Sequence, residues 1–409
     1  MSLTPSHDPV PSQASLRARP VRYPERPWFS SGPTAKRPGW SLEALSSARL
    51  GRSNRSASTV GRLNEALDLT REILQVPDDY AVTFVPGSDT GAFEAALWNL
   101  LGPRPVQVLS FENFSQLWAT DTRDHLGINP EILSAPYGAL PDLGQINPEA
   151  DLVFAWNGTT AGVKVPNGDF IAADRGGLTL CDATSATFSM DLPWDKLDVV
   201  TFSFQKALGG EAGIGALILS PRAVARLDSH TPAWPIPKVL RLRKGEGADR
   251  AILAGDAINT YSFLVIEDYI DALRWAGRIG GLDALIARTE ANADVLEDWV
   301  ERTPWIDYLA VDPATRSTTS VCLKFVDPIV SALSSDAQAA FVKAFCALLE
   351  REQAAFDISG YRAAPPGLRI WCGCTVDAED LRALTPWLEW AWSQMHVEAT
   401  QSASELSPT

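Results

Sequence analysis

Short apolar runs that alternate with helical patterns constrain this 409-residue chain more than any other feature. Strands are predicted at 81–85, 106–111, 152–156, 178–181 and 199–204. Between the first two, the apolar positions of Phe93–Leu100 follow the i, i+3, i+4, i+7 spacing of a helix, and a longer helix is predicted within 256–275. This alternation predicts an α/β fold with a largely parallel sheet.

The chain divides by composition into four predicted parts. Residues 1–27 are rich in Pro, Ser and Arg and predict a disordered or draped N-terminal arm. A large α/β domain is predicted at 28–278, with its first residues packing against the small domain. A smaller α+β domain is predicted at 279–398, and 399–409 is a polar tail. Short strands of the smaller domain are predicted at 320–326 and 368–371.

Composition excludes several classes of protein. The net charge of -15 disfavours nucleic acid and anionic membrane surfaces as partners. No apolar stretch approaches the ~20 residues that span a bilayer, and no secretory signal pattern is present, so we expect a cytoplasmic protein. An anionic substrate would have to be held by a few local arginines.

The cysteines and histidines predict neither a disulfide framework nor a metal site. The chain has 5 Cys, an odd number that is widely spread, and only 4 His, none of them clustered. Cys372 and Cys374 resemble half of a metal site, but no second Cys or His pair lies near them in the sequence. We therefore expect free thiols and no metal.

Three chemically distinctive features follow predicted strands. The run LTLC leads into Asp182, and VVTFSF leads into Gln205 and Lys206. The run AVTFV leads into the turn Gly87–Gly91, which opens a helix. Ligands of open α/β sheets bind outside the carboxyl ends of the strands. An acid, a lysine and a helix N-terminus are therefore predicted to meet at one sheet edge.

Pyridoxal 5'-phosphate (PLP) requires such a set of groups. Its aldehyde needs a lysine such as Lys206 for a Schiff base, and its ring nitrogen needs a carboxylate such as Asp182. Its phosphate suits the free amides of a helix start. Trp118, beyond the next strand, could stack on the ring. One strand–helix–strand unit separates Asp182 from Lys206, which would place them on adjacent strands.

Each of these residues, taken alone, is weak evidence for PLP binding. A lysine or an aspartate after a strand is usually a solvated charge or a helix cap, and a lone tryptophan is usually core. Nucleotide binding is disfavoured because no Walker pattern is present. The Gly-rich stretch 209–215 also fails the G-x-G-x-x-G spacing and leads into a strand. The order of turn, aromatic ring, acid and lysine favours PLP.

Seven segments together resemble the phosphoserine aminotransferase family, class V enzymes of PLP fold-type I. The resemblance covers about residues 26 to 395. The segments are FSSGPTAKRPGW (29–40), GRSNRS (51–56), PGSDTGAFEAALW (86–98), WNGTTAGVKVPN (156–167), CDATSA (181–186), TFSFQKALGGEAG (201–213) and GLRIW (367–371). It implies a seven-stranded-type sheet and reversible amino transfer from L-glutamate to 3-phosphohydroxypyruvate. The products would be O-phospho-L-serine and 2-oxoglutarate, in serine biosynthesis, with pyridoxine biosynthesis as a further setting.

The resemblance assigns roles at the cofactor. Lys206 matches the Schiff-base lysine, and Gln205 matches a contact to the cofactor phosphate. Asp182 matches the partner of the ring nitrogen, Trp118 the stacking ring and Thr159 the hydroxyl near the ring oxygen. Lys206, Asp182 and Trp118 are thereby the implied catalytic residues.

The resemblance also implies a shared site. Asp89, Thr90 and Gly91 fall in the phosphate-binding turn. Asn259 and Thr260 match a pair that reaches the cofactor phosphate of the neighbouring subunit. A homodimer with shared active sites follows from that match.

The resemblance also assigns substrate recognition to Arg55, Arg362 and Arg369. Arg369 is the best match for the residue that binds the α-carboxylate, because the planar guanidinium suits a carboxylate. Many family members carry His before the first two arginines, where this chain has Asn54 and Tyr361. Because Asn and Tyr cannot carry positive charge, anion affinity would fall by ~1–2 kcal/mol per site. The departures leave the phosphate preference open.

Three other classes compete with this reading. One is a class V transaminase or lyase on another small 2-oxo acid or on unphosphorylated serine or alanine. A second is a non-catalytic binding or regulatory protein of the same fold, against which the retained Lys206, Asp182 and Trp118 argue. A third is a nicotinamide dehydrogenase, which the missing dinucleotide fingerprint disfavours.

Overall fold

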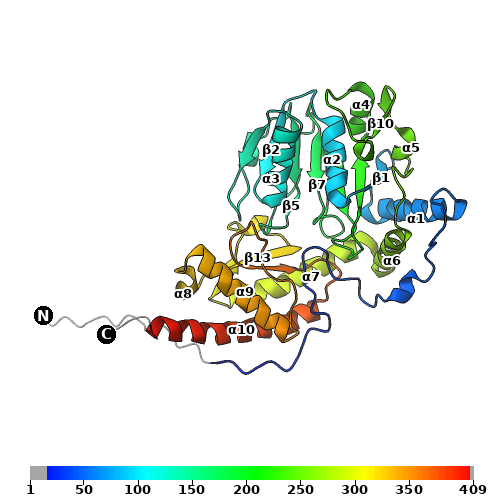
Figure 1. Cartoon of the computed structure of the whole chain (residues 1–409). Coiled ribbons are helices and arrows are strands. Elements are labelled where there is room, and N and C mark those ends of the chain that lie inside the picture. Colours follow the sequence, from blue (N-terminus) through cyan, green and yellow to red (C-terminus); the bar gives the residue numbers. More distant parts are fainter. Residues whose placement is uncertain (1–15, 406–409) are drawn as a thin grey trace.

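A large sheet organises the computed structural model, which describes residues 16–405 and, of 397–405, the backbone alone (Figure 1). Its 7 strands run in the order β1-β9-β8-β7-β4-β2-β3. Strand β9 is antiparallel to β1 and β8, and the remaining neighbours are parallel. The predicted α/β class and mostly parallel seven-stranded sheet are thus confirmed. The strands are β1 (Ala81–Pro86), β2 (Val106–Ser110), β3 (Glu131–Ser134), β4 (Asp151–Ala155), β7 (Thr179–Asp182), β8 (Val199–Ser203) and β9 (Ile214–Leu219).

Helices cover both faces of this sheet, and strands such as β2, β4 and β8 are therefore buried along their whole length. Phe84 and Phe202 share a core with α1 and α6, while Val85 and Val199 share another with α2 and α4. The helices are α1 (Ala57–Leu74), α2 (Ser88–Leu100), α3 (Asn113–Thr120), α4 (Pro221–Ser229), α5 (Arg250–Leu253) and α6 (Phe263–Ile279).

A second, antiparallel sheet of 3 strands lies beside the large one in the order β12-β13-β14. Its core is rich in tryptophan, and Trp299, Trp371 and Trp387 are fully buried there. The domain limits at 278 and 398 stay predictions. The strands and helices of this part are β12 (Ile306–Tyr308), β13 (Ser320–Phe325), β14 (Leu368–Trp371), α7 (Gly281–Glu301), α8 (Pro328–Ser331), α9 (Ser335–Arg351) and α10 (Ala378–Glu405).

Several short elements connect these layers, among them a π-helical turn, η2, directly after α3. The short strands are β5 (Asn157–Gly158), β6 (Val163–Lys164), β10 (Arg243–Lys244) and β11 (Gly247–Ala248). The short helical turns are η1 (Leu42–Leu45), η2 (Asp121–His125), η3 (Leu143–Gln145), η4 (Trp194–Lys196), η5 (Lys238–Leu240) and η6 (Pro313–Thr315).

The N-terminal segment lies along the second sheet's helices. Of the predicted arm, residues 1–15 lie outside the described range. Farther on, Arg19 pairs with Glu352 at 2.5 Å, and Trp387 Nε1 donates to the Arg22 carbonyl at 2.9 Å. The segment then carries Ser31 to the large sheet. At the other end, the backbone of α10 continues into the predicted tail, whose last residues, 406–409, lie outside the described range.

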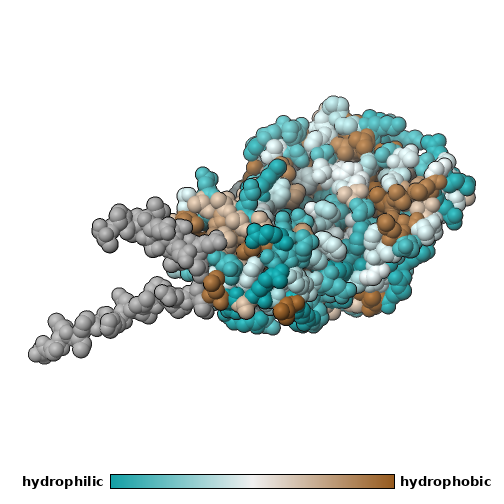
Figure 2. Space-filling view, turned by 60° about the horizontal axis from the view of Figure 1, so that its bottom comes forward, coloured by the Kyte–Doolittle hydropathy of each residue, from teal (hydrophilic) through white to brown (hydrophobic). Residues whose placement is uncertain are grey.

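The face shown in Figure 2 is mostly hydrophilic and carries separate hydrophobic patches. Exposed apolar side chains include Trp28 near the N-terminus, Leu42 in η1, Val60 in α1 and Leu264 in α6. Within residues 16–405, no helix combines the length and the apolar character needed to cross a membrane.

Candidate active site

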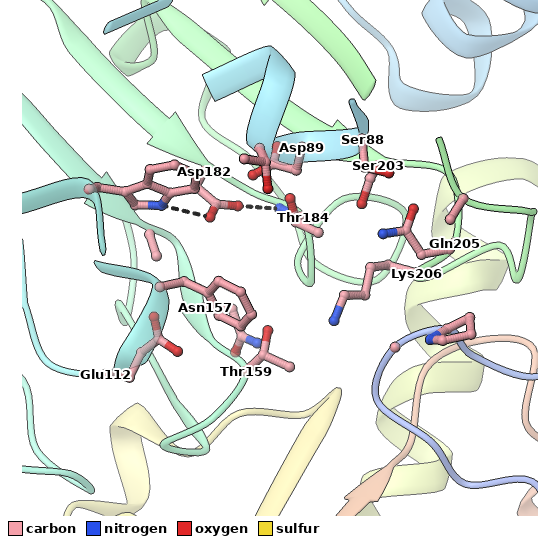
Figure 3. Close-up of a pocket in the computed structure, with 17 residues that line it drawn as sticks. Ser88, Asp89, Glu112, Asn157, Thr159, Asp182, Thr184, Ser203, Gln205 and Lys206 are labelled. Carbon is pink, nitrogen blue, oxygen red and sulfur yellow. Dashed lines mark hydrogen bonds between the residues drawn. The ribbon is translucent and has the colours of Figure 1, made fainter. Parts of the chain in front are cut away.

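The carboxyl ends of three strands build one cavity of about 240 Å³ (Figure 3). Asp182 is the last residue of β7, Lys206 follows β8 and the turn after β1 opens α2. Strands β7 and β8 are parallel neighbours, as the sequence spacing predicts. Of the predicted site residues, the cavity brings together Asp89, Thr90, Trp118, Thr159, Asp182, Gln205 and Lys206.

Lys206 points into this cavity and is almost buried, with 9% of its surface exposed. Its Nζ donates a hydrogen bond to the Ser31 carbonyl. A side chain on Gly32 would come within 2.6 Å of Nζ, so the tip of Lys206 would have to move to make room for it. Burial, followed by the charge of Arg369, lowers the Lys206 pKa to about 8. The amine can therefore be neutral and nucleophilic near physiological pH.

The Asp182 carboxylate is fixed by two N–H donors. Its Oδ2 accepts from Trp118 Nε1 at 3.1 Å, and its Oδ1 accepts from the Thr184 amide at 3.0 Å. Trp118 is held in turn by Phe93, with ring centroids 4.6 Å apart. Charge-assisted hydrogen bonds of this kind stabilise the ionised carboxylate. Asp182 can thus hold a proton on a heterocyclic nitrogen.

The turn before α2 provides an anion site. Gly87 has φ 91, which favours glycine, and α2 begins at Ser88. A side chain on Gly91 would lie 1.9 Å from the Pro86 carbonyl, so Gly91 lets the helix start close to the strand end. Gly91 shapes the turn and does not line the cavity. The N-terminal amides of α2 thereby face the cavity.

Several buried polar atoms around the cavity have no hydrogen-bond partner among the described residues. Ser203 Oγ and Gln205 Oε1 are buried without a hydrogen-bond partner among the described residues. Asp89 is 7% exposed, and its Oδ1 is likewise buried and unpartnered within residues 16–405. Burial, followed by the charge of Asp182, raises the Asp89 pKa. A buried polar group without a partner is costly, which favours a polar ligand here.

The Arg369 guanidinium lies near Lys206 and is a candidate anion anchor. Arg369 lies on β14 and its charge lowers the Lys206 pKa. Its Cζ sits 5.5 Å from the centroid of the Tyr361 ring, and Nε finds no hydrogen-bond partner in the described part of the chain. Burial lowers the Arg369 pKa. A bound carboxylate would offset that desolvation.

Other predicted residues lie away from the cavity. Arg55 is exposed in the turn before α1, and Arg362 is exposed next to Tyr361. Asn259 and Thr260 are exposed in the loop between α5 and α6. In the described structure these four residues are absent from the cavity wall.

The cavity wall also contains residues that the sequence did not single out. Ser88 lies within the predicted turn, beside Asp89, Ser203 lies two residues before Gln205, and Thr184 lies in the CDATSA segment. Thr159 donates to Ser185 Oγ at 2.7 Å. Glu112 is buried and caps α3 by accepting from the Ser115 amide at 2.8 Å. Glu112 and Ser115 stand in the opposite order to the usual Ser/Thr-x-x-Glu capping signature, so no standard motif marks Glu112 in the sequence.

These residues fit PLP. A buried lysine with a lowered pKa suits the aldehyde, and a doubly hydrogen-bonded aspartate suits the ring nitrogen. The α2 N-terminus, with the unpartnered Ser203 and Gln205 oxygens of the described cavity wall, suits the phosphate. When bound, PLP supplies an electron sink for the carbon that loses its proton.

Comparison with known proteins agrees with this fit. Residues 43–344 match the family model "Aminotransferase class-V", and the chain belongs to this family of PLP-dependent aminotransferases. Within the family it is similar to the phosphoserine aminotransferase of Methanosarcina barkeri, with 53% identity over 92% of this chain and 99% of the relative. The Methanosarcina mazei phosphoserine aminotransferase is 52% identical over 91% of this chain and 99% of the relative.

Solved structures share the fold. A phosphoserine aminotransferase from Cytophaga hutchinsonii has a TM-score of 0.71 at 21% identity, covering 88% of this chain and 98% of that one. A ureidoglycine-glyoxylate aminotransferase from Bacillus subtilis has a TM-score of 0.74 at 16% identity, covering 95% of this chain and 99% of that one. Since enzymes named for different substrates match equally well, the fold alone does not choose the substrate.

Proposed function

We propose that the chain is a phosphoserine aminotransferase. It would transfer an amino group reversibly, in ping-pong fashion, between L-glutamate and 3-phosphohydroxypyruvate, giving O-phospho-L-serine and 2-oxoglutarate in serine biosynthesis. The observation that carries the proposal is the identity of 53% with a phosphoserine aminotransferase over 92% of this chain.

The residues of the cavity support the proton transfers of such a reaction. The Lys206 amine, whose pKa is lowered to about 8, can take a proton from the substrate α-carbon and return one to the cofactor side. The Asp182 carboxylate, held by Trp118 and Thr184, would keep the ring nitrogen protonated. These groups are held before substrate arrives, which favours fast proton transfer.

Arg369 supports recognition of an acidic substrate. It is a half-buried cation near Lys206 on a chain whose net charge is -15, so local positive charge is scarce. Its planar fork suits the α-carboxylate that both amino donors share. Arg55 and Arg362 would contact the substrate phosphate, and Tyr361 would hold Arg369 against its ring.

We further propose a homodimer that works in the cytoplasm. Arg55, Asn259 and Thr260 are exposed and do not line the cavity of their own chain in the described structure, which suits residues that serve a neighbouring subunit. Exposed Leu42, in η1, and Leu264, in α6, belong to elements that pack together and offer apolar area for such a contact.

Amino-donor profiling tests the substrate. We expect kcat/KM for L-phosphoserine to exceed that for L-serine, L-alanine and L-aspartate by about 100-fold, because two charge-assisted hydrogen bonds to phosphate contribute roughly 3 kcal/mol. Equal turnover of an unphosphorylated donor would instead establish the other candidate, a class V transaminase with a different substrate.

Mixed dimers test the shared site. We expect Lys206→Ala and Asn259→Ala/Thr260→Ala proteins to be inactive or weak alone. A mixture that has been allowed to exchange subunits should regain activity, because one of its two sites then contains every required group. Failure to regain activity, with exchange shown by native mass spectrometry, would contradict shared sites.

A further inference from the structure

A second carboxyl group lies close to the Asp182 carboxylate. Asp89, in the first turn of α2, lines the same cavity as Asp182 (Figure 3). In the close-up it lies beside Asp182 and Thr184, at the end of the cavity away from Glu112. Its place in the turn suggests a phosphate contact, but its carboxyl group lies near enough to Asp182 for the two to influence each other's charge.

The surroundings of Asp89 are buried and polar. Helix α2 packs on β7 and β8, and Asp182 on β7 is paired with Thr201 on β8. Asp89 Oδ1, Thr184 Oγ1 and Thr201 Oγ1 are all buried, and within residues 16–405 none of the three makes a well-formed hydrogen bond, but the two threonine hydroxyls lie near enough to Asp89 to lower its pKa against the effect of burial. Threonine hydroxyls can donate to one carboxyl group, but two adjacent buried carboxyl groups repel each other when both are ionised, and a proton shared between them removes one of the two negative charges.

The charged and titratable groups that face Asp89 come from two neighbouring strands. Asp182 lies at the end of β7 and Lys206 follows β8, while Cys181, the preceding residue of β7, packs in the core on the opposite face of the sheet. Asp182 accepts hydrogen bonds from Trp118 and Thr184, which stabilise its ionised form. Burial, with the Asp182 charge second, raises the Asp89 pKa. The proton that two adjacent buried carboxyl groups share therefore belongs on Asp89.

We propose that Asp89 is a positioning residue: it is a neutral carboxylic acid at neutral pH and donates a hydrogen bond to the Asp182 carboxylate. A single negative charge then faces the cofactor ring nitrogen. The neutral acid also keeps a second negative charge away from the α2 N-terminus, where the cofactor phosphate would bind. Asp89 thus acts on the cofactor through Asp182.

Cofactor affinity of the apoprotein provides the first test. Asp89→Asn keeps the shape and the donor of the neutral acid, so its PLP dissociation constant should stay within about 3-fold of the wild-type value. Asp89→Ala removes the donor and should weaken PLP binding about 10-fold. Asp283→Asn, an exposed acid in the first turn of α7, is the matched control and should change nothing. A 10-fold loss in Asp89→Asn would overturn the proposal, because the negative charge itself would then be needed.

The pH dependence of the apoprotein's melting temperature provides the second test and needs neither cofactor nor substrate. A carboxyl whose folded pKa is raised contributes stability that is present below its unfolded pKa and is lost as pH rises toward the folded pKa. The Asp89→Asn protein has no such group. Its melting temperature should rise relative to wild type between pH 5 and pH 8, by about 2 °C or more.

A role limited to capping or packing would not depend on pH, so a constant difference between Asp89→Asn and wild type would overturn the proposal. The Asp283→Asn control should keep a constant difference over the same range. Because both tests use the apoprotein, their outcome is separate from the identity of the amino donor.

Discussion

The two ends of the active site are built differently. At the cofactor end, Asp182 and Lys206 are 7% and 9% exposed, extend from neighbouring strands and are held by specific hydrogen bonds. At the proposed substrate end, Arg55 and Arg362 lie on exposed loops. The buried sheet edge would therefore carry the chemistry common to the family. The loops, which tolerate change, would carry the choice of substrate.

The largest expected effect is at the cofactor end. Lys206→Ala should lower kcat for transamination by at least about 10⁴-fold, because it removes the group that moves the proton. The protein should still fold, as circular dichroism would show. Lys238→Ala, at an exposed lysine, is the control and should keep full activity. Substantial turnover by the Lys206 variant would defeat the assignment of the site.

Asp182→Ala should have the next largest effect. Removing one partner of a buried ionic contact costs roughly 3–5 kcal/mol, so PLP affinity and kcat should together fall by about 10²–10³-fold. Equilibrium binding of PLP and initial rates would measure both. Asp191→Ala, at an exposed aspartate, is the matched control and should leave both quantities unchanged. An unchanged rate would mean that Asp182 does not face the ring nitrogen.

The Arg369→Leu substitution should affect the substrate end of the active site without affecting the cofactor end. We expect kcat/KM to fall about 100-fold for phosphorylated and unphosphorylated acids alike, because the lost contact is to the shared carboxylate. PLP affinity should stay within about 3-fold of wild type. If PLP affinity fell as far as kcat/KM, the half-buried guanidinium would belong to the cofactor end instead.

Arg55→Ala should have a smaller and selective effect. An exposed phosphate contact contributes about 1–2 kcal/mol, so kcat/KM for phosphoserine should fall about 10-fold while that for serine is unchanged. The loss should shrink as salt rises. Arg52→Ala, three residues earlier and equally exposed, should behave as wild type. Equal losses for both donors would remove Arg55 from phosphate recognition.

The smallest expected effect is on the pH dependence of the rate at which the apoprotein binds PLP. The neutral Lys206 amine would be the form that reacts with PLP, and the Lys206 pKa is lowered to about 8, chiefly by burial. The rate at which apoprotein recombines with PLP should therefore rise with pH around a midpoint near 8. Removing the Arg369 charge in Arg369→Leu should move that midpoint upward. A midpoint near that of free lysine would show a solvated amine.

Local sequence was enough to predict the sheet edge. Each strand that ends at the site is a short apolar run followed at once by its polar group, as in LTLC before Asp182. The contact of Lys206 with Ser31 was beyond such reasoning, because it joins segments far apart in the chain. The position of Asp89 beside Asp182 was also beyond it, and the phosphate contact that the family resemblance implies for Asp89 stays a prediction. The positions of Arg55 and Asn259 relative to a neighbouring subunit remain predictions, since a single chain does not contain that contact.

The most direct measurement is a half-reaction titration of the PLP-loaded protein, followed by the visible absorbance of the bound cofactor. L-phosphoserine and L-serine would be added to separate samples without an amino acceptor. We predict that phosphoserine removes the visible band at a concentration about 100-fold lower than serine does. If serine acts at the same concentration as phosphoserine, the proposed substrate is wrong, and if no visible band forms with PLP, the proposed cofactor site is wrong.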